Sequence, residues 1–198
     1  HNYKFKLYFL NLNIDFNKVL FFCMRHKSVK VISLIVFFLF ASSSSLAALK
    51  VGDRAPNFSL RDQNNITHEL NDYKGNWVVL YFYPKDGTPG CTTQACDFRD
   101  AVKRIIASKS VVFGVSLDSV ESHRLFSEKN KLPFSLLSDE TGEVAKLYDS
   151  LRNLLVYKTA KRNTFIIDPK GVVAKIYLSV NPKNHSEMIL NDLDNLQD

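Results

Sequence analysis

The residues best suited to chemistry lie between Tyr81 and Cys96. An apolar run, Trp77 to Phe82, leads into a loop rich in proline and glycine, and this loop ends at Cys91, in the first turn of a predicted helix. The N-terminus of a helix carries partial positive charge and unpaired N–H groups, which favour a cysteine thiolate. Because the thiolate is the nucleophilic form, the arrangement predicts a reactive thiol at position 91, with a second thiol, Cys96, five positions later.

The elements that must position this loop predict a mixed α/β domain. Apolar runs bounded by turn residues predict strands over 58–60, 66–70, 77–82, 111–115, 134–137, 162–167 and 172–178. Apolar residues at helical spacing predict helices over 91–108, 119–129, 140–148 and 185–196. This succession indicates a mixed sheet with helices, although the order alone does not single out one fold.

The charge of the chain is unevenly distributed. The 198 residues include 26 basic and 20 acidic side chains, a formal net charge of +6. Residues 1–47 hold six basic groups and one acidic group, a net of +5, so residues 48–198, with 20 basic and 19 acidic groups, carry only +1. Because the basic charge belongs to the N-terminal segment, the usual argument for nucleic-acid binding is removed. Residues 48–198 are enough for one domain with a sizeable core.

The N-terminal segment has the pattern of an export signal. Residues 24–30 are basic, residues 31–40 are apolar but too few to span a bilayer comfortably, and Ser45-Leu46-Ala47 matches the cleavage rule. We therefore expect a signal peptide over 24–47, export to a bacterial periplasm, and no stable membrane association after cleavage. An uncleaved membrane anchor is the alternative. Residues 1–23 are expected to be translated upstream sequence or the product of a misassigned start.

The loop and its surroundings resemble the peroxiredoxins, most closely the Q-type, or bacterioferritin comigratory protein, branch. The family pattern Pro-x-x-x-Thr-x-x-Cys corresponds to Pro84, Thr88 and Cys91, and the second cysteine of the branch corresponds to Cys96. Further matches are Phe98-Arg99-Asp100, Leu137-Ser138-Asp139-Glu140 and the segment 162–168. The similarity extends from about Leu49 to the C-terminus. The segment 149–161, which contains no glycine, departs from the branch.

The resemblance implies a role for each matched residue. Cys91 would be the peroxidatic nucleophile and Cys96 the resolving thiol that forms a disulfide with it. Arg162 would stabilise the thiolate and the leaving oxygen, Thr88 would hydrogen-bond the peroxide and the thiolate, and Pro84 would shield the site from water. Taken alone, the cysteines are equally consistent with an inert disulfide or structural thiols. Likewise, Thr88 is consistent with a capping hydroxyl, Arg162 with an exposed charge and Pro84 with an ordinary loop proline.

The spacing of the two cysteines makes a geometric prediction. Five residues of helix correspond to a rise of about 7.5 Å, whereas a disulfide tolerates Cα separations up to about 6.8 Å. The helix must therefore unwind locally between Cys91 and Cys96 before the bond can form. Thr92 and Thr93 are β-branched and suit a first turn that can open.

The resemblance implies a thioredoxin-like fold, with helices on both faces of a mixed sheet, and a monomeric thiol peroxidase. Its substrates would be hydrogen peroxide and organic hydroperoxides, its reductant a thioredoxin-like protein, and no metal, flavin or haem is implied. His68, His123 and His185 are isolated in the sequence, and no Cys/His spacing suggests zinc. Two alternatives are a thiol–disulfide oxidoreductase, which usually carries Cys-x-x-Cys, and a non-catalytic binding module with a structural disulfide.

Overall fold

The computed structural model describes residues 48–154 and 156–197. Residues 48–198 form one compact unit. The predictions made for residues 1–47, an upstream extension and a signal peptide, lie outside the described residues. No helix within the described ranges is both long and apolar enough to cross a membrane.

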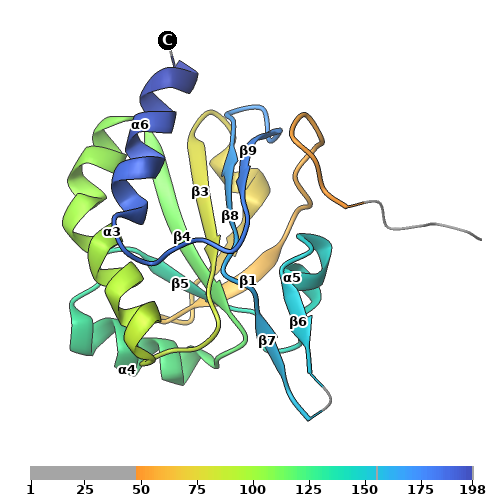
Figure 1. Cartoon of the computed structure of the whole chain (residues 1–198), viewed down its shortest axis with the longest axis vertical. Coiled ribbons are helices and arrows are strands. Elements are labelled where there is room, and N and C mark those ends of the chain that lie inside the picture. The colour runs from red at the N-terminus through yellow and green to blue at the C-terminus, as the bar shows by residue number, and fades with distance from the viewer. Residues whose placement is uncertain (1–47, 155, 198) are drawn as a thin grey trace, which may run out of the picture. The chain divides into compact units, whose positions relative to one another are not determined.

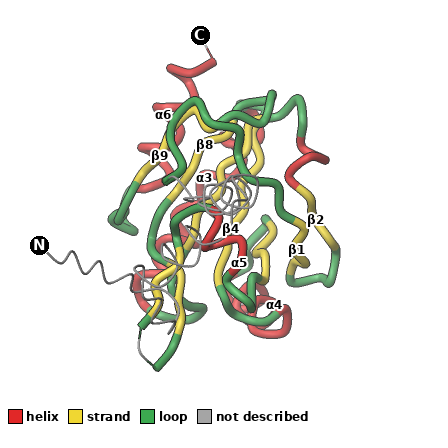
Figure 2. The backbone as a smooth tube through the Cα atoms, turned by 90° about the vertical axis from the view of Figure 1, so that its right-hand side faces the viewer, coloured by secondary structure: helices red, strands yellow, loops and turns green. Residues whose placement is uncertain are grey.

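The main sheet contains seven strands, and most of the predicted strands are confirmed (Figure 1). They are β1 (Ser59–Asp62), β2 (Thr67–Glu69), β3 (Trp77–Phe82), β4 (Ser110–Ser116), β5 (Ser135–Ser138), β8 (Thr164–Ile167) and β9 (Val173–Tyr177). Their spatial order is β2-β1-β5-β4-β3-β8-β9. The neighbours β3, β4 and β5 are parallel, whereas β8, β9, β1 and β2 pair antiparallel. The hairpin β1–β2 and the hairpin β8–β9 therefore lie at opposite edges of the sheet (Figure 2).

The helices cover both faces of this sheet, as expected. They are η1 (Leu70–Tyr73), α3 (Pro89–Ala107), α4 (Val120–Asn130), α5 (Glu143–Leu147) and α6 (His185–Gln197). One core cluster joins α3, α4 and α6 to the sheet face that carries Val79 and Tyr81. A second cluster joins η1 and α5 to the face that carries Val78 and Leu80. Successive residues of β3 thus enter opposite cores, which explains its continuous apolar sequence.

Two segments differ from the sequence-based expectation. The helix predicted over 140–148 is shorter, because Gly142 adopts a positive φ of 75° and α5 begins only at Glu143. The segment for which no element was predicted forms a separate two-stranded hairpin, β6 (Leu151–Asn153) with β7 (Lys158–Ala160). Figure 1 shows this hairpin projecting from the domain. It contacts the loop between β3 and α3, because the Thr159 hydroxyl donates a 2.6 Å hydrogen bond to the Pro84 carbonyl.

The sheet topology decides which residues meet at the end of β3. Because β8 runs antiparallel to β3, with Tyr81 opposite Thr164, the start of β8 lies beside the end of β3. The loop that follows β3 leads to α3, and Arg162 lies two residues before the first residue of β8. The topology therefore brings Arg162 to the N-terminus of α3, across a long separation in the sequence.

Candidate active site

Cys91 lies in the first turn of α3 and is only 2 % exposed. Thr88 is the N-cap residue and Pro89 the first helical residue, a position that proline favours. The first intrahelical hydrogen bond runs from the Thr92 N–H to the Thr88 carbonyl, at 2.9 Å. The N–H groups of Gly90 and Cys91 therefore precede the hydrogen-bonded ladder of the helix, as is general at helix N-termini. The predicted location of the thiol at the start of a helix is confirmed.

Arg162 contacts the sulfur directly. Its Nη2 donates to Cys91 Sγ at 3.3 Å. Gly90 leaves room for this approach, since a Cβ at that position would lie 3.3 Å from Nη2, closer than most Cβ contacts. The guanidinium therefore brings positive charge and an N–H donor to the atom predicted to react, as the resemblance to the peroxiredoxins implies.

A second contact of Arg162 was not predicted from the sequence. Its Nη1 donates to Gln94 Oε1 at 2.5 Å, and Gln94 Nε2 lies 2.9 Å from His185 Nδ1. Both Gln94 and His185 are fully buried. A signal for this was present, because Gln94 shares the helical spacing of the apolar residues Phe98 and Ile105. His185, isolated in the sequence, is therefore part of the site in three dimensions.

The loop between β3 and α3 is held by the buried carboxylate of Asp86. This carboxylate accepts hydrogen bonds from the Tyr83 hydroxyl at 2.7 Å and the Ser122 hydroxyl at 2.8 Å. His123 Nδ1 lies 2.8 Å from it, and because a carboxylate only accepts, this nitrogen donates. The Asp86 backbone N–H donates to Asp118 at 2.8 Å. These contacts fix the loop to the start of α4, and the sequence analysis missed them because they join distant segments.

Thr88 caps the helix that carries Cys91, and Pro84 lies in the loop before it, but their contacts differ from the expected ones. The Thr88 hydroxyl donates to the Lys85 carbonyl at 3.2 Å, and no hydrogen bond to Cys91 is found within the described residues. Pro84 is half-buried, and its carbonyl accepts from Thr159. A contact of Thr88 with peroxide and a shielding role for Pro84 both stay predictions.

Cys96 lies in the same continuous helix as Cys91, and both thiols are free. Cys96 is half-buried, whereas Cys91 is buried. The helix thus has the geometry for which local unwinding was predicted. Whether a disulfide joins these two residues stays a prediction.

Tyr81 packs in the same buried cluster as Cys91. Burial, and then the negative charges of Asp86 and Cys91, raise the pKa of Tyr81 well above its ordinary value. The phenol therefore keeps its proton at neutral pH, so Tyr81 cannot serve as a base at the site.

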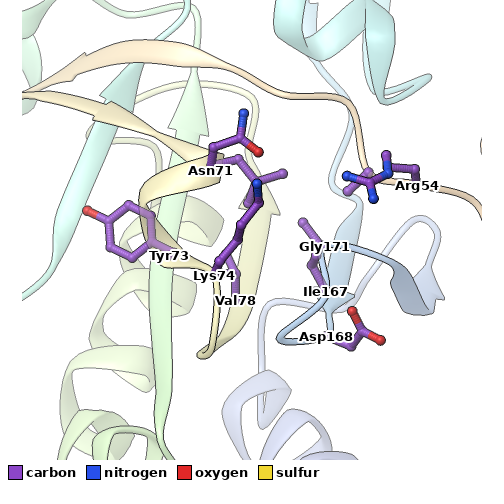
Figure 3. A pocket seen from close by; sticks show the side chains of 10 residues that line it. Arg54, Asn71, Tyr73, Lys74, Val78, Ile167, Asp168 and Gly171 are labelled. Carbon is purple, nitrogen blue, oxygen red and sulfur yellow. The ribbon is translucent and has the colours of Figure 1, made fainter.

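The described residues contain no group of three or more side chains suited to hold a metal ion. A pocket lies on another part of the domain (Figure 3). Its lining contains no cysteine, histidine or serine and no residue of the site around Cys91; it consists of Arg54, Ala55, Leu70, Asn71, Tyr73, Lys74, Val78, Ile167, Asp168 and Gly171. This pocket offers no thiol, and we place the chemistry at Cys91 instead.

The buried His185 makes stability depend on pH. Burial, and then the charge of Arg162, lower the pKa of His185 to about 4 from 6.5. Below pH 6.5 His185 binds a proton in the unfolded protein but stays neutral in the folded protein. The contribution of His185 to the free energy of unfolding is therefore complete above pH 6.5 and is lost as the pH falls to about 4. The full loss is about 3 kcal/mol.

Urea denaturation of the wild type and a His185→Asn variant, at intervals between pH 7.5 and 4, measures this contribution. Other titrating groups are common to both proteins. As the pH falls through this window, the unfolding free energy of the wild type should therefore decrease by about 3 kcal/mol relative to that of the variant. A difference that is constant with pH would show that His185 does not titrate in this way.

Three comparisons show which known proteins this chain resembles. Residues 51–176 match the model of the AhpC/TSA family. The chain is 41% identical over 154 residues to "Peroxiredoxin Bcp" of Bacillus subtilis (strain 168), covering 76% of this chain and 98% of that protein. The structure is similar to the crystal structure of peroxidoxin BcpB from Mycobacterium tuberculosis, with a TM-score of 0.72, 34% identity and coverage of 76% of this chain and 99% of the other.

A bacterioferritin comigratory protein of Xanthomonas campestris, whose structures address alkyl peroxide reduction, is also similar. Its TM-score is 0.69 at 30% identity, and the match covers 77% of this chain and 99% of that one. The family match spans more than half of the chain, and the relatives are covered almost completely. The chain therefore belongs to the AhpC/TSA family and is a peroxiredoxin, a thiol-dependent peroxidase with a thioredoxin-like fold.

Proposed function

We propose that Cys91 is the peroxidatic nucleophile and Cys96 the resolving thiol of this peroxidase. The observation that carries the proposal is the 3.3 Å hydrogen bond from Arg162 to the buried Cys91 sulfur at the start of α3. The thiol lies in the first turn of a helix, at its positive end, and accepts a hydrogen bond from a guanidinium. Both features favour an anionic sulfur, and the guanidinium can also stabilise an oxyanion that develops beside it.

In the first step the Cys91 thiolate attacks one oxygen of the peroxide. An S–O bond forms as the O–O bond breaks, the sulfur loses two electrons, and the second oxygen leaves as water or an alcohol after it takes up a proton. Cys91 becomes a sulfenic acid. Arg162 is positioned to neutralise the negative charge that develops on the leaving oxygen.

In the second step the Cys96 thiolate attacks the sulfenic sulfur. The S–S bond forms as the S–O bond breaks, and the oxygen leaves as hydroxide, which takes up a proton to become water. The half-buried Cys96 cannot reach Cys91 while both remain in the helix, because five residues rise by about 7.5 Å. The first turn and a half of α3 must open. This opening also breaks the contacts of Gln94, which lies between the two cysteines.

The substrates proposed are hydrogen peroxide and organic hydroperoxides, and the similarity to the Xanthomonas protein, whose structures address alkyl peroxide reduction, supports the second class. A thioredoxin-like protein would return the disulfide to two thiols. The half-buried position of Cys96 supports this, since a reductant needs access to one sulfur.

Intact mass measured after one equivalent of hydrogen peroxide tests both roles. The chain is used with Cys23 replaced by serine, so that Cys91 and Cys96 are its only thiols. The reduced protein should become lighter by two hydrogens within seconds, and a thioredoxin system should restore the starting mass. The Cys96→Ser variant should instead gain one oxygen and be trapped by a reagent for sulfenic acids.

The outcomes separate the two parts of the proposal. If the parent forms no disulfide while Cys96→Ser still gains an oxygen, Cys96 is not the resolving thiol but Cys91 remains the nucleophile. If neither protein reacts faster than an ordinary thiol, the assignment of Cys91 is wrong as well.

Export and a monomeric state are part of the same proposal. Export is supported by the basic and apolar pattern of residues 24–40 and by Ser45-Leu46-Ala47. N-terminal sequencing of the protein recovered from a bacterial periplasm should begin at Ala48, and light scattering should give the mass of one chain. Retention in the membrane fraction would favour the uncleaved anchor.

A further inference from the structure

A buried chain of polar side chains connects the C-terminal helix to the reactive sulfur. It runs from His185, the first residue of α6, through Gln94 on α3 to Arg162, and ends at Cys91. The helices α3 and α6 lie side by side (Figure 1). These hydrogen-bonded side chains therefore link two helices that are distant in the sequence, since Gln94 and His185 are 91 residues apart.

The hydrogen-bonding capacities of these groups allow one arrangement. A guanidinium has donors and no acceptor, so Gln94 must present its oxygen to Arg162. The amide NH₂ of Gln94 then faces His185 Nδ1, which must be bare and accept. The remaining proton of the neutral ring is on Nε2. Any change that removes the acceptor at Nδ1 leaves a buried amide without a partner for its NH₂.

The surroundings of His185 hold its ring in place. The ring is 1 % exposed and packs edge-on against Phe98, with centroids 5.1 Å apart, and against Tyr177 at 6.2 Å. The start of α6 is also anchored, because the Ser186 N–H donates to Asp97 at 2.6 Å. Burial and the charge of Arg162 lower the pKa of His185 to about 4, so the ring stays neutral at physiological pH.

We propose that His185 is a positioning residue of the peroxidase: by accepting from the Gln94 amide it fixes the orientation in which Gln94 holds the Arg162 guanidinium against Cys91. This inference rests on the proposed role of Cys91. His185 itself does not touch the sulfur, and it acts through two intervening side chains.

Loss of the acceptor has a defined consequence. In a His185→Leu variant the Gln94 amide has no partner for its NH₂. Rotation of the amide towards another acceptor then lowers the free energy, because it pairs a buried donor. Rotation withdraws the oxygen from Arg162, so the guanidinium loses one of its two anchors. The rate constant for the reaction of Cys91 with peroxide should fall about five- to tenfold, the worth of one buried hydrogen bond.

The test compares His185→Leu with His185→Asn. Leucine keeps an apolar side chain in the buried site but has no acceptor, whereas asparagine is smaller and polar but can place an oxygen near the position of Nδ1. We expect Asn to retain the rate within about twofold and Leu to lose five- to tenfold. Urea denaturation accompanies both, because a purely structural role predicts that the rates follow the stabilities, whatever group occupies Nδ1.

A double-mutant cycle with Arg162→Met completes the test. If His185 acts through the guanidinium, His185→Leu should cost almost nothing further once Arg162 is gone. Equal effects of His185→Leu in both backgrounds, or equal rates of the Leu and Asn variants, would overturn the inference. The nitrogen-15 chemical shifts of the ring provide a readout independent of activity, and a protonated Nδ1 would also contradict it.

Failure of this inference is distinguishable from failure of the proposed function. If the wild-type protein consumes peroxide rapidly and only the His185 predictions fail, the role of Cys91 stands. If the wild type itself reacts slowly at Cys91, the proposed role of that residue fails first.

Discussion

Replacing Cys91 by serine is expected to abolish rapid peroxide reduction. A serine hydroxyl stays protonated at neutral pH and is a poor nucleophile towards oxygen, so the guanidinium of Arg162 would face a group that cannot react. The rate constant for peroxide consumption should fall by about 10⁴-fold or more, to the value expected if the remaining Cys96 reacts as an ordinary thiol. Competition for hydrogen peroxide against a protein of known rate measures it.

Cys96→Ser is the matched control, since it removes a thiol from the same helix. Its first turnover should proceed at the rate of the wild type, and only its recycling should fail. A Cys91→Ser protein that still reacts rapidly, with Cys96→Ser inactive, would exchange the two roles. Circular dichroism should be unchanged in both variants, because serine is close in size to cysteine.

Replacing Arg162 by methionine is expected to lower the rate constant for peroxide by about 10² to 10³-fold. Methionine retains an unbranched side chain but has neither the charge nor the two donors that serve Cys91 and Gln94. The rate constant of Arg162→Lys should lie between those of the wild type and Arg162→Met. An ammonium keeps the charge but lacks the planar fork that reaches both acceptors. Stopped-flow mixing with hydrogen peroxide gives the rate constants.

The neighbouring Lys161 supplies the control for general charge. Its ammonium forms an exposed pair with Asp149 at 3.2 Å. Lys161→Met should leave the rate unchanged within about twofold, because exposed pairs contribute little. Equal losses for Lys161→Met and Arg162→Met would show that the net charge of the surface matters and that the contact with Cys91 does not.

The sequence by itself was sufficient to predict the strand–loop–helix unit that carries Cys91. The apolar strand β3 was predicted with its observed limits, and α3 begins within two residues of the predicted start. Such elements are predictable because their signals are local: a continuous apolar run, a Pro/Gly loop, and apolar residues at helical spacing. The hairpin turn at Asp168–Gly171 was predicted for the same reason.

The sequence could not predict which distant polar groups share the site. His185 is separated from Gln94 by 91 residues, and His123 from Asp86 by 37. The β6–β7 hairpin was also missed, because its strands are three residues long and carry little pattern. Arg162 was assigned its role by resemblance to the family, and its own neighbourhood in the sequence does not distinguish it from an exposed charge.

Local residue patterns thus determined the fold class and the thiol, whereas the tertiary structure decided how that thiol is held. Strand β8 pairs antiparallel with β3 and brings Arg162 to the start of α3, and the packing of α6 on α3 brings His185 to Gln94. The physical reason is that a buried polar group must find a partner, and burial by the fold determines which partner is within reach.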